Sequence, residues 1–201
     1  GLTTQYLLRR TYNVKAGDTI LAHAAAGGVG LILCQWAKAI GATVIGTVGS
    51  DEKAALAKAN GCDHAIVYTR EDFVARVKEI TGGKGVPVVY DSVGKDTFMK
   101  SLDCLSPLGL MVIFGNSSGN APDLPTGMLA AKGSLFVTRP TLMTYMAKRE
   151  DLVKSADDLF GMVGSGKVKI DVRQTYALKD ATKAHQDLEA RRTSGSTILI
   201  P

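Results

Sequence analysis

Residues 19–40 constrain the fold more than any other part of the sequence. They begin with a short, mostly apolar segment, residues 19–24, which follows Gly17 and Asp18 and is typical of a buried strand. A glycine-rich turn comes next, and from Gly28 the chain is almost wholly apolar over a length that only a helix can accommodate. The sequence therefore predicts a strand, a tight turn and a helix in direct succession.

The turn, residues 25–30, has the composition of a dinucleotide-binding loop. In a β-α-β unit, such a turn presents backbone N–H groups and a helix N-terminus to a pyrophosphate. The usual G-x-G-x-x-G pattern is incomplete, because Ala25 takes the first glycine position while Gly27 and Gly30 keep the other two. A Walker phosphate loop is excluded, because no Gly-Lys-Ser/Thr follows. The alternative is a tight turn that binds no ligand.

Strand and helix patterns alternate along the rest of the chain. An amphipathic pattern at 73–80 is typical of a helix, and Asn60-Gly61 ends an earlier Ala-rich helix. Further strands are expected at residues 43–48, 65–68, 86–90, 110–114 and 134–138. This alternation predicts an α/β fold of the Rossmann type, a doubly wound, parallel, six-stranded sheet with helices on both faces.

The remaining segments are a helix near 95–105, a long helical stretch from Pro140 to about residue 163, an amphipathic helix around 178–188 and a closing strand at 197–200. The first residue is Gly1, and residues 2–8 are typical of a helix already under way. We therefore expect the chain to be part of a longer protein.

The end of the second strand indicates which dinucleotide is bound. NAD-binding proteins place an acidic residue there for the ribose 2′-hydroxyl, but Val48-Gly49 carries none. Asp51 lies inside the helix start, where an acidic residue stabilises free N–H groups. Lys53, together with Ser50, offers a charge and a hydrogen bond to a 2′-phosphate. The sequence favours NADP(H), the alternative being that Lys53 is an ordinary exposed lysine.

Charge and cysteine usage exclude several classes of protein. The net charge of +5 is dispersed among acidic residues, which is typical of a solvated surface and not of a nucleic-acid interface. No apolar run reaches membrane-spanning length. Cys34, Cys62 and Cys104 are widely spaced and form no C-x-x-C motif, so we expect reduced thiols of a cytoplasmic protein.

A series of motifs resembles one superfamily of enzymes. In chain order they are AAAGGVG, GTVGSDEK, YDSVG, FGNSSG, GSLFVTRP and AHQDLEARRTSGSTILIP. Together they resemble the medium-chain dehydrogenase/reductase superfamily. The similarity is greatest to its zinc-free branch of NADPH-dependent quinone oxidoreductases related to ζ-crystallin, and it extends over essentially the whole chain.

The resemblance implies an organisation and an activity. Residues 1–165 would form the NADP-binding domain, residues 166–201 would return to a catalytic domain, and that N-terminal catalytic domain would be absent from this chain. NADPH would deliver hydride to a quinone or a similar conjugated carbonyl, and the alternative acceptor is an enoyl or 2-alkenal compound. We expect no bound metal. We also expect a homodimer, formed through the exposed edge strand at residues 135–138.

The resemblance also implies which residues contact NADPH. These are Tyr6, Gly28, Val29, Gly49, Ser50, Lys53, Tyr68, Ser92, Phe114, Gly115, Asn116, Ser117, Phe136, Val137, Thr138 and Arg191. The alternative for Tyr68 and Phe114 is a place in the core at a strand end, and for Arg191 a place on an exposed helix.

No catalytic acid or base can be named from the sequence. We expect Asp91 to anchor the loop after its strand, and His23 and His185 to be structural. A non-catalytic nucleotide- or RNA-binding module is a hypothesis of another class, since a fold does not establish a function. The dispersed charge disfavours it.

Overall fold

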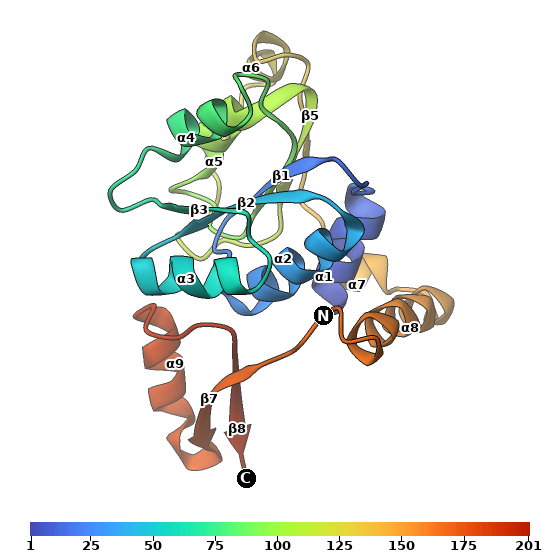
Figure 1. Cartoon of the computed structure of the whole chain (residues 1–201), viewed down its shortest axis with the longest axis vertical. Coiled ribbons are helices and arrows are strands. Elements are labelled where there is room, and N and C mark those ends of the chain that lie inside the picture. Colours follow the sequence, from blue (N-terminus) through green and yellow to red (C-terminus); the bar gives the residue numbers. More distant parts are fainter.

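A computed structural model describes residues 1–201 and has a six-stranded sheet at its centre (Figure 1). All its strands are parallel, in the order β3-β2-β1-β4-β5-β6. The strands are β1 Thr19–Ala22, β2 Thr43–Val48, β3 His64–Val67, β4 Val86–Asp91, β5 Leu105–Ile113 and β6 Phe136–Thr138. The expected fold class is confirmed.

Helices cover both faces of this sheet. Helices α1, α2 and α3 lie on one face, and α4 and α5 lie on the other (Figure 1). The helices are α1 Leu2–Tyr6, α2 Gly28–Ile40, α3 Asp51–Ala59, α4 Phe73–Ile80, α5 Phe98–Ser101, α6 Thr126–Ala131, α7 Leu142–Tyr145, α8 Arg149–Gly164 and α9 Ala181–Glu189. A π-helical turn at Leu7–Thr11 extends α1, and 3-10 turns lie at Leu102–Cys104 and Leu178–Asp180.

The alternation of side chains along each strand builds two separate cores. In β1, Ile20 joins the cluster under α2, which contains the fully buried Trp36. Its neighbour Leu21 points to the opposite face and joins the cluster under α4 and α5. Because both sides of the strand are buried, the central strands are apolar throughout, which is typical of a parallel sheet.

Two expected helices are shorter in the structure. The stretch from Pro140 is divided into α7 and α8 at Lys148, whose ψ of 137° is extended, and the Tyr145 carbonyl accepts from Arg10 Nη1 at 2.7 Å. That carbonyl would otherwise accept the next bond of a continuous helix. The helix expected near 95–105 is reduced to α5 and a 3-10 turn, because Leu105 already pairs with Val86 in the sheet.

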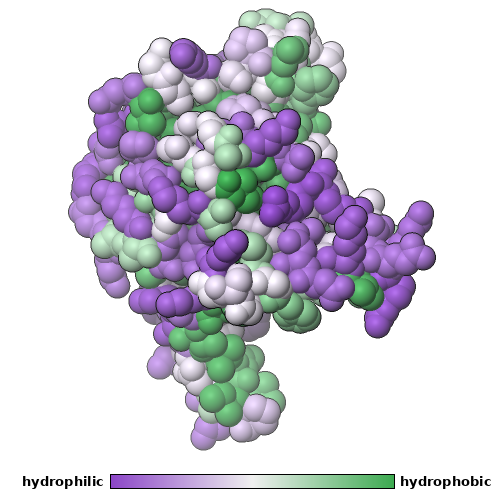
Figure 2. Space-filling view, turned by 45° about the vertical axis from the view of Figure 1, so that its right-hand side comes forward, coloured by the Kyte–Doolittle hydropathy of each residue, from purple (hydrophilic) through white to green (hydrophobic).

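The C-terminal residues form a separate small layer. Strands β7 Val172–Ala177 and β8 Ser196–Ile200 pair in parallel, and α9 lies beside them below the main sheet (Figure 1). The sequence did not predict β7, because its polar residues hide the apolar alternation. This part exposes a green, hydrophobic surface at the lower end of Figure 2, to which Val172, Leu178, Leu188, Ile198, Leu199 and Ile200 contribute.

None of the helices combines the length and the apolar character that crossing a membrane requires.

The N-terminal helical segment is attached to the sheet by a buried hydrogen bond. The hydroxyl of Tyr90, in β4, donates to the Leu7 carbonyl at 3.0 Å, and both residues are fully buried. We expect Tyr90→Phe to lower the free energy of unfolding by about 1 kcal/mol, because a buried hydrogen bond is lost and the Leu7 carbonyl keeps only the Tyr12 N–H as its donor. Chemical denaturation measures this change. Tyr12→Phe is the control, since the structure shows no hydrogen bond from the Tyr12 hydroxyl, and an equal effect of both substitutions would contradict the prediction.

Candidate functional site

The residues that the sequence singled out gather at the carboxyl edge of the sheet. Most of them lie in the loops that follow successive strands, and β6 contributes its own three residues. After β1 come Gly28 and Val29; after β2, Gly49, Ser50 and Lys53; after β3, Tyr68; after β4, Ser92; after β5, Phe114, Gly115, Asn116 and Ser117; and β6 is Phe136, Val137 and Thr138. This is the edge where open parallel sheets bind their ligands.

The glycine-rich turn leaves the start of α2 open to an anion. Gly27 is the N-cap of α2 and supplies no side-chain acceptor, and the first turn contains no acidic residue. A Cβ atom on Gly30 would lie 2.4 Å from the Ala24 carbonyl oxygen, so only glycine allows this close approach of helix and turn. The left-handed residue is Ala24, at φ 54°, and Ala25 has no positive φ. An alanine therefore fits at the first position of the motif.

A second group of residues lies around the start of α3. The Ser50 hydroxyl accepts from the Lys53 N–H at 3.3 Å and caps the helix. Tyr68 is 43 % exposed, and a Cβ atom on Gly49 would lie 3.0 Å from its hydroxyl. The Lys53 ammonium donates to the Arg191 carbonyl at 2.7 Å. The structure thus brings together residues from β2, β3, α3 and the C-terminal part.

Asp51, the acidic residue nearest to this group, is already paired. Both of its carboxylate oxygens accept hydrogen bonds from the Arg70 guanidinium, which lowers the pKa of Asp51. Its place in the first turn of α3 agrees with the role expected at a helix start. The Asp51 carboxylate is therefore already engaged and not free for a ribose hydroxyl.

The loops after β4 and β5 are in contact. A Cβ atom on Gly115 would lie 2.6 Å from the Ser92 carbonyl oxygen, and the same oxygen accepts from the Ser117 N–H at 3.2 Å. Asp91 Oδ1 accepts from the N–H groups of Val93 and Gly94 at 2.7 and 3.0 Å. Asp91 thus anchors its loop, as the sequence predicted.

Tyr6 differs from the other candidate residues because it is buried. Its side chain is 2 % exposed and its ring stacks on Tyr145, with 4.5 Å between the ring centroids. Burial is the main cause of its raised pKa, Tyr145 adds to the effect and Arg139 opposes it. Arg139 follows β6 and donates to the Ile113 carbonyl at 3.0 Å. Tyr6 therefore lies near the ends of β5 and β6, but beneath Tyr145.

Neither of the two singled-out histidines belongs to a catalytic triad. His23 is buried, and its two ring nitrogens lie 2.8 Å from Thr47 Oγ1 and Ser101 Oγ. Burial lowers the pKa of His23, and nearby Asp91 opposes this effect. His185 lies exposed on α9. The structural role expected for His23 is confirmed.

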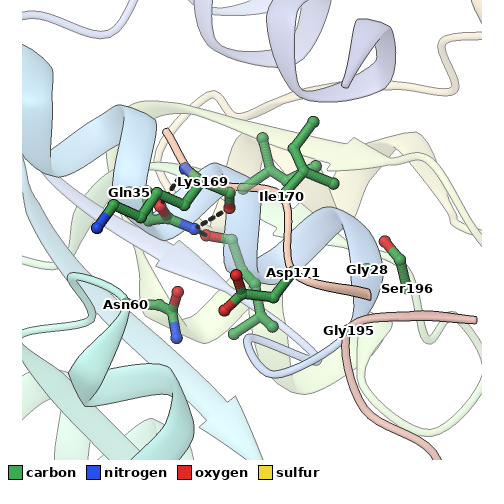
Figure 3. A pocket seen from close by; sticks show the side chains of 10 residues that line it. Gly28, Gln35, Asn60, Lys169, Ile170, Asp171, Gly195 and Ser196 are labelled. Carbon is green, nitrogen blue, oxygen red and sulfur yellow. Dashed lines mark hydrogen bonds between the residues drawn. The ribbon is translucent and has the colours of Figure 1, made fainter. Parts of the chain in front are cut away.

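Sequence reasoning missed a contact between the C-terminal part and the glycine-rich turn. The Gly195 N–H donates to the Ala26 carbonyl at 3.0 Å, and Gly195 forms an isolated bridge with Gly27. Figure 3 shows Gly195 and Ser196 beside Gly28, at a narrow hollow with room for about one water molecule. Gly195 stands between two serines before a strand, which signals a turn but not its distant partner.

On the other side of this hollow, Gln35 of α2 holds the segment before β7. Gln35 Nε2 donates to the Lys169 carbonyl at 3.0 Å, and the Lys169 N–H donates to Gln35 Oε1 at 2.7 Å (Figure 3). The C-terminal part is thus attached near its start, through Lys169, to α2, and near its end, through Gly195, to the turn that precedes α2.

The comparison with known proteins identifies the family. The family described as "Zinc-binding dehydrogenase" matches residues 28–166. The chain belongs to this zinc-binding dehydrogenase family. Quinone oxidoreductase 1 of Escherichia coli (strain K12) is 57 % identical over 203 residues, which cover the whole chain and 62 % of that protein. The 2-haloacrylate reductase of a Burkholderia species is 50 % identical over 202 residues, which cover the whole chain and 61 % of that protein.

A solved structure shows the same relationship. E. coli quinone oxidoreductase complexed with NADPH matches with a TM-score of 0.97 at 56 % identity, over the whole chain and 62 % of that chain. The chain therefore spans about three fifths of the length of the curated relatives that it matches. The resemblance to quinone oxidoreductases inferred from the motifs is confirmed.

The zinc in the name of this dehydrogenase family has no matching set of ligands in the chain. No group of three or more His, Cys, Asp and Glu side chains is arranged to hold a metal ion. Cys34, Cys62 and Cys104 are buried free thiols, and burial raises the pKa of Cys104 to about 12. Zinc binds the thiolate form, which burial disfavours at Cys104. The residues present do not fit zinc.

The close approach at Gly30 leads to a stability prediction. We expect Gly30→Ala to lower the free energy of unfolding by about 3 kcal/mol, because the new methyl group would meet backbone atoms of Ala24 and Ala25. Thermal or urea denaturation measures the change. The matched control is Gly127→Ala in α6, where a Cβ atom meets nothing within 4 Å and should be neutral or slightly stabilising. A Gly30→Ala protein as stable as the control would contradict this description of the turn.

Proposed function

We propose that this chain is the cofactor-binding part of a reductase that transfers hydride from NADPH to a quinone or a similar conjugated carbonyl. The observation that carries the proposal is the pairing, at one sheet edge, of an open helix start with a cationic group. The start of α2 offers N–H groups without a side-chain acceptor, and Lys53, in the first turn of α3, lies just beyond the end of β2, where an NAD-binding protein would have an acid. The relative whose solved structure is described as complexed with NADPH supports this cofactor.

Each part of the edge has a role in holding the cofactor. The N–H groups of Gly28 and Val29 would bind the pyrophosphate, helped by the positive end of the α2 dipole. Ser50, Lys53 and Tyr68 would surround the adenosine 2′-phosphate, with Gly49 giving the room and Arg191 a second cation. The nicotinamide half would lie on the remaining candidates, namely Ser92, Phe114, Gly115, Asn116, Ser117, Phe136, Val137 and Thr138, with Tyr6 beneath them.

NADPH supplies the hydride when it is bound and solvent would supply the proton that completes the reduction, so the role proposed for this chain is to orient the cofactor. No nucleophile and base pair is part of the proposal. The loops after β4 and β5 fix one another through Ser92 and Ser117, and this contact would hold one face of the nicotinamide against the protein. The opposite face would then be left for the acceptor.

The identity of the acceptor depends on more than the cofactor site. Quinones and 2-alkenals are both conjugated electrophiles, and the relatives include quinone oxidoreductases and a 2-haloacrylate reductase. An enoyl or 2-alkenal reductase is therefore the second candidate. Steady-state kinetics distinguish the two candidates. The rates with a quinone and with a 2-alkenal are compared in a protein that contains this chain together with its catalytic domain. A non-catalytic RNA-binding module would instead show salt-dependent binding of single-stranded RNA.

We also propose that residues 1–165 are the NADP-binding domain and that residues 166–201 contact a separate catalytic domain. The apolar side chains exposed on β7, β8 and α9 support this, because a surface of this kind is usually covered by protein (Figure 2). Removal of residues 166–201 should then leave a folded Rossmann domain. Unfolding of that shorter chain, measured by circular dichroism, would contradict the division.

The cytoplasm is the compartment we propose for this protein. Its three cysteines are buried free thiols, which agrees with a reducing environment. Disulfide-linked protein isolated from cells would contradict this proposal.

The role of Lys53 can be tested directly by calorimetric titration with NADPH and with NADH. We expect NADPH to bind more tightly than NADH, and Lys53→Ala to weaken NADPH binding by about tenfold while leaving NADH binding unchanged. The physical reason is that only NADPH carries the 2′-phosphate.

Lys58→Ala is the matched control, because Lys58 lies exposed in the last turn of the same helix. Equal binding of NADPH and NADH by the unmodified chain would show that the 2′-phosphate is not recognised. A tenfold loss in the control as well would assign the effect to the general charge of α3.

We propose in addition that the protein forms a homodimer through β6. This strand is at the edge of the sheet, and the Phe136 side chain is 59 % exposed. Light scattering of the unmodified chain should give a dimer mass, and Phe136→Lys should shift it towards the monomer, because a charged edge resists pairing. Met143→Lys is the control at another exposed apolar residue, 80 % exposed on α7. A monomer at high concentration would contradict the proposal.

A further inference from the structure

His23 follows β1 directly and lies beneath the carboxyl edge of the sheet. It is 2 % exposed, so it cannot form part of the surface that a dinucleotide touches. Its Nδ1 atom lies 2.8 Å from Thr47 Oγ1 in β2, and its Nε2 atom lies 2.8 Å from Ser101 Oγ at the end of α5. One buried side chain therefore connects two central strands to a short helix.

The hydrogen bonds around His23 determine its protonation. The Ser101 hydroxyl donates to the Thr97 carbonyl at 2.8 Å, so its oxygen accepts from His23 Nε2–H. His23 Nδ1 is then the acceptor of the Thr47 hydroxyl. The neutral ring satisfies every partner, whereas a protonated ring would leave the Thr47 hydroxyl without its acceptor. Burial, which lowers the pKa of His23, favours the same neutral form.

From α5 the chain of hydrogen bonds continues to the loop after β4. Thr97, the N-cap residue of α5, donates from Oγ1 to Asp91 Oδ2 at 2.8 Å. The other oxygen of Asp91 holds the N–H groups of Val93 and Gly94. Ser92 lies between these anchored residues. The position of the Ser92 loop is thus connected, through α5, to His23.

This series of hydrogen bonds joins a rigid element, the sheet, to a less rigid one, α5. Strands β1 and β2 are fixed by their parallel ladder, which pairs Thr19–Ala22 with residues 43–46. Helix α5 contains four residues, and a helix of one turn is not stable without contacts to the rest of the fold. The burial of Phe98 holds one side of α5, and the His23–Ser101 hydrogen bond holds its end. The sheet therefore fixes the position of α5, and α5 in turn fixes the position of the loop after β4.

We propose that His23 is a positioning residue of the dinucleotide site, which fixes α5 and the Asp91–Gly94 loop so that the nicotinamide half of NADPH can bind. This inference rests on the proposed function. The groups around the ring are Thr47 from β2, Ser101 from α5, the Phe73 ring from α4, which lies T-shaped to it, and Asp91 from β4. Asp91 is the charged group among them.

The test uses the full chain with His23→Leu, which fills the space but makes no hydrogen bond. Calorimetry measures the affinity for NADPH and for adenosine 2′,5′-bisphosphate, which carries the adenosine half alone. We expect NADPH affinity to fall about tenfold and bisphosphate affinity to stay within about twofold. Val44→Ala, at a fully buried position near the opposite end of β2, is the control that should leave both affinities within about twofold.

A second variant and a second measurement do not depend on the cofactor. Ser101→Ala removes a hydroxyl from the same series of hydrogen bonds and leaves His23 in place. This variant can be used if the His23→Leu protein does not fold. Hydrogen exchange at the Val93 and Gly94 amides should become about tenfold faster in either variant, while the Ile45 amide in β2 stays unchanged.

Equal losses of affinity for NADPH and for the bisphosphate would overturn the proposal, since they would indicate a general disturbance of the site. Unchanged exchange at Val93 and Gly94 would overturn it as well. An unmodified chain that does not bind NADPH contradicts the proposed function, and the exchange rates then still decide whether His23 positions the loop.

Discussion

The close contact of α2 with the end of β1 is the constraint on which the rest of the structure depends. At Gly30 the helix approaches the backbone of Ala24 and Ala25 so closely that no side chain fits. This contact directs the start of α2 to the carboxyl edge of the sheet, where its N–H groups remain free of side-chain acceptors. The apolar faces of α2 and β1 then determine where the central strands and Trp36 are buried.

Most of this architecture follows from local patterns in the sequence. The six strands and the helix start at Gly28 are visible as apolar runs, turns and caps, because each of these signals acts within a few residues, and the alternation of strands with helices predicts that the strands are parallel. The motifs also locate the candidate residues, since the loops after parallel strands meet at one edge. Asp91 was correctly expected to anchor its loop.

Long-range contacts explain what the sequence did not show. At the break between α7 and α8, the Tyr145 carbonyl accepts a hydrogen bond from Arg10, which is distant in the chain. Strand β7 pairs only with β8, and its polar side chains conceal it. The stacking of Tyr6 under Tyr145 and the contact of Gly195 with Ala26 also join remote segments. No local propensity or spacing specifies partners of this kind.

The contact between Gly195 and Ala26 has a consequence for the order in which the molecule is completed during synthesis. The glycine-rich turn and α2 leave the ribosome before residue 195 and can form from neighbouring residues, as in most β-α-β units. Gly195 leaves the ribosome well after them, together with Arg191, whose carbonyl accepts the hydrogen bond of the Lys53 ammonium. A nascent chain can thus have a folded sheet while one wall of its ligand site is still missing, and that wall is added only when the residues around Gly195 have been synthesised.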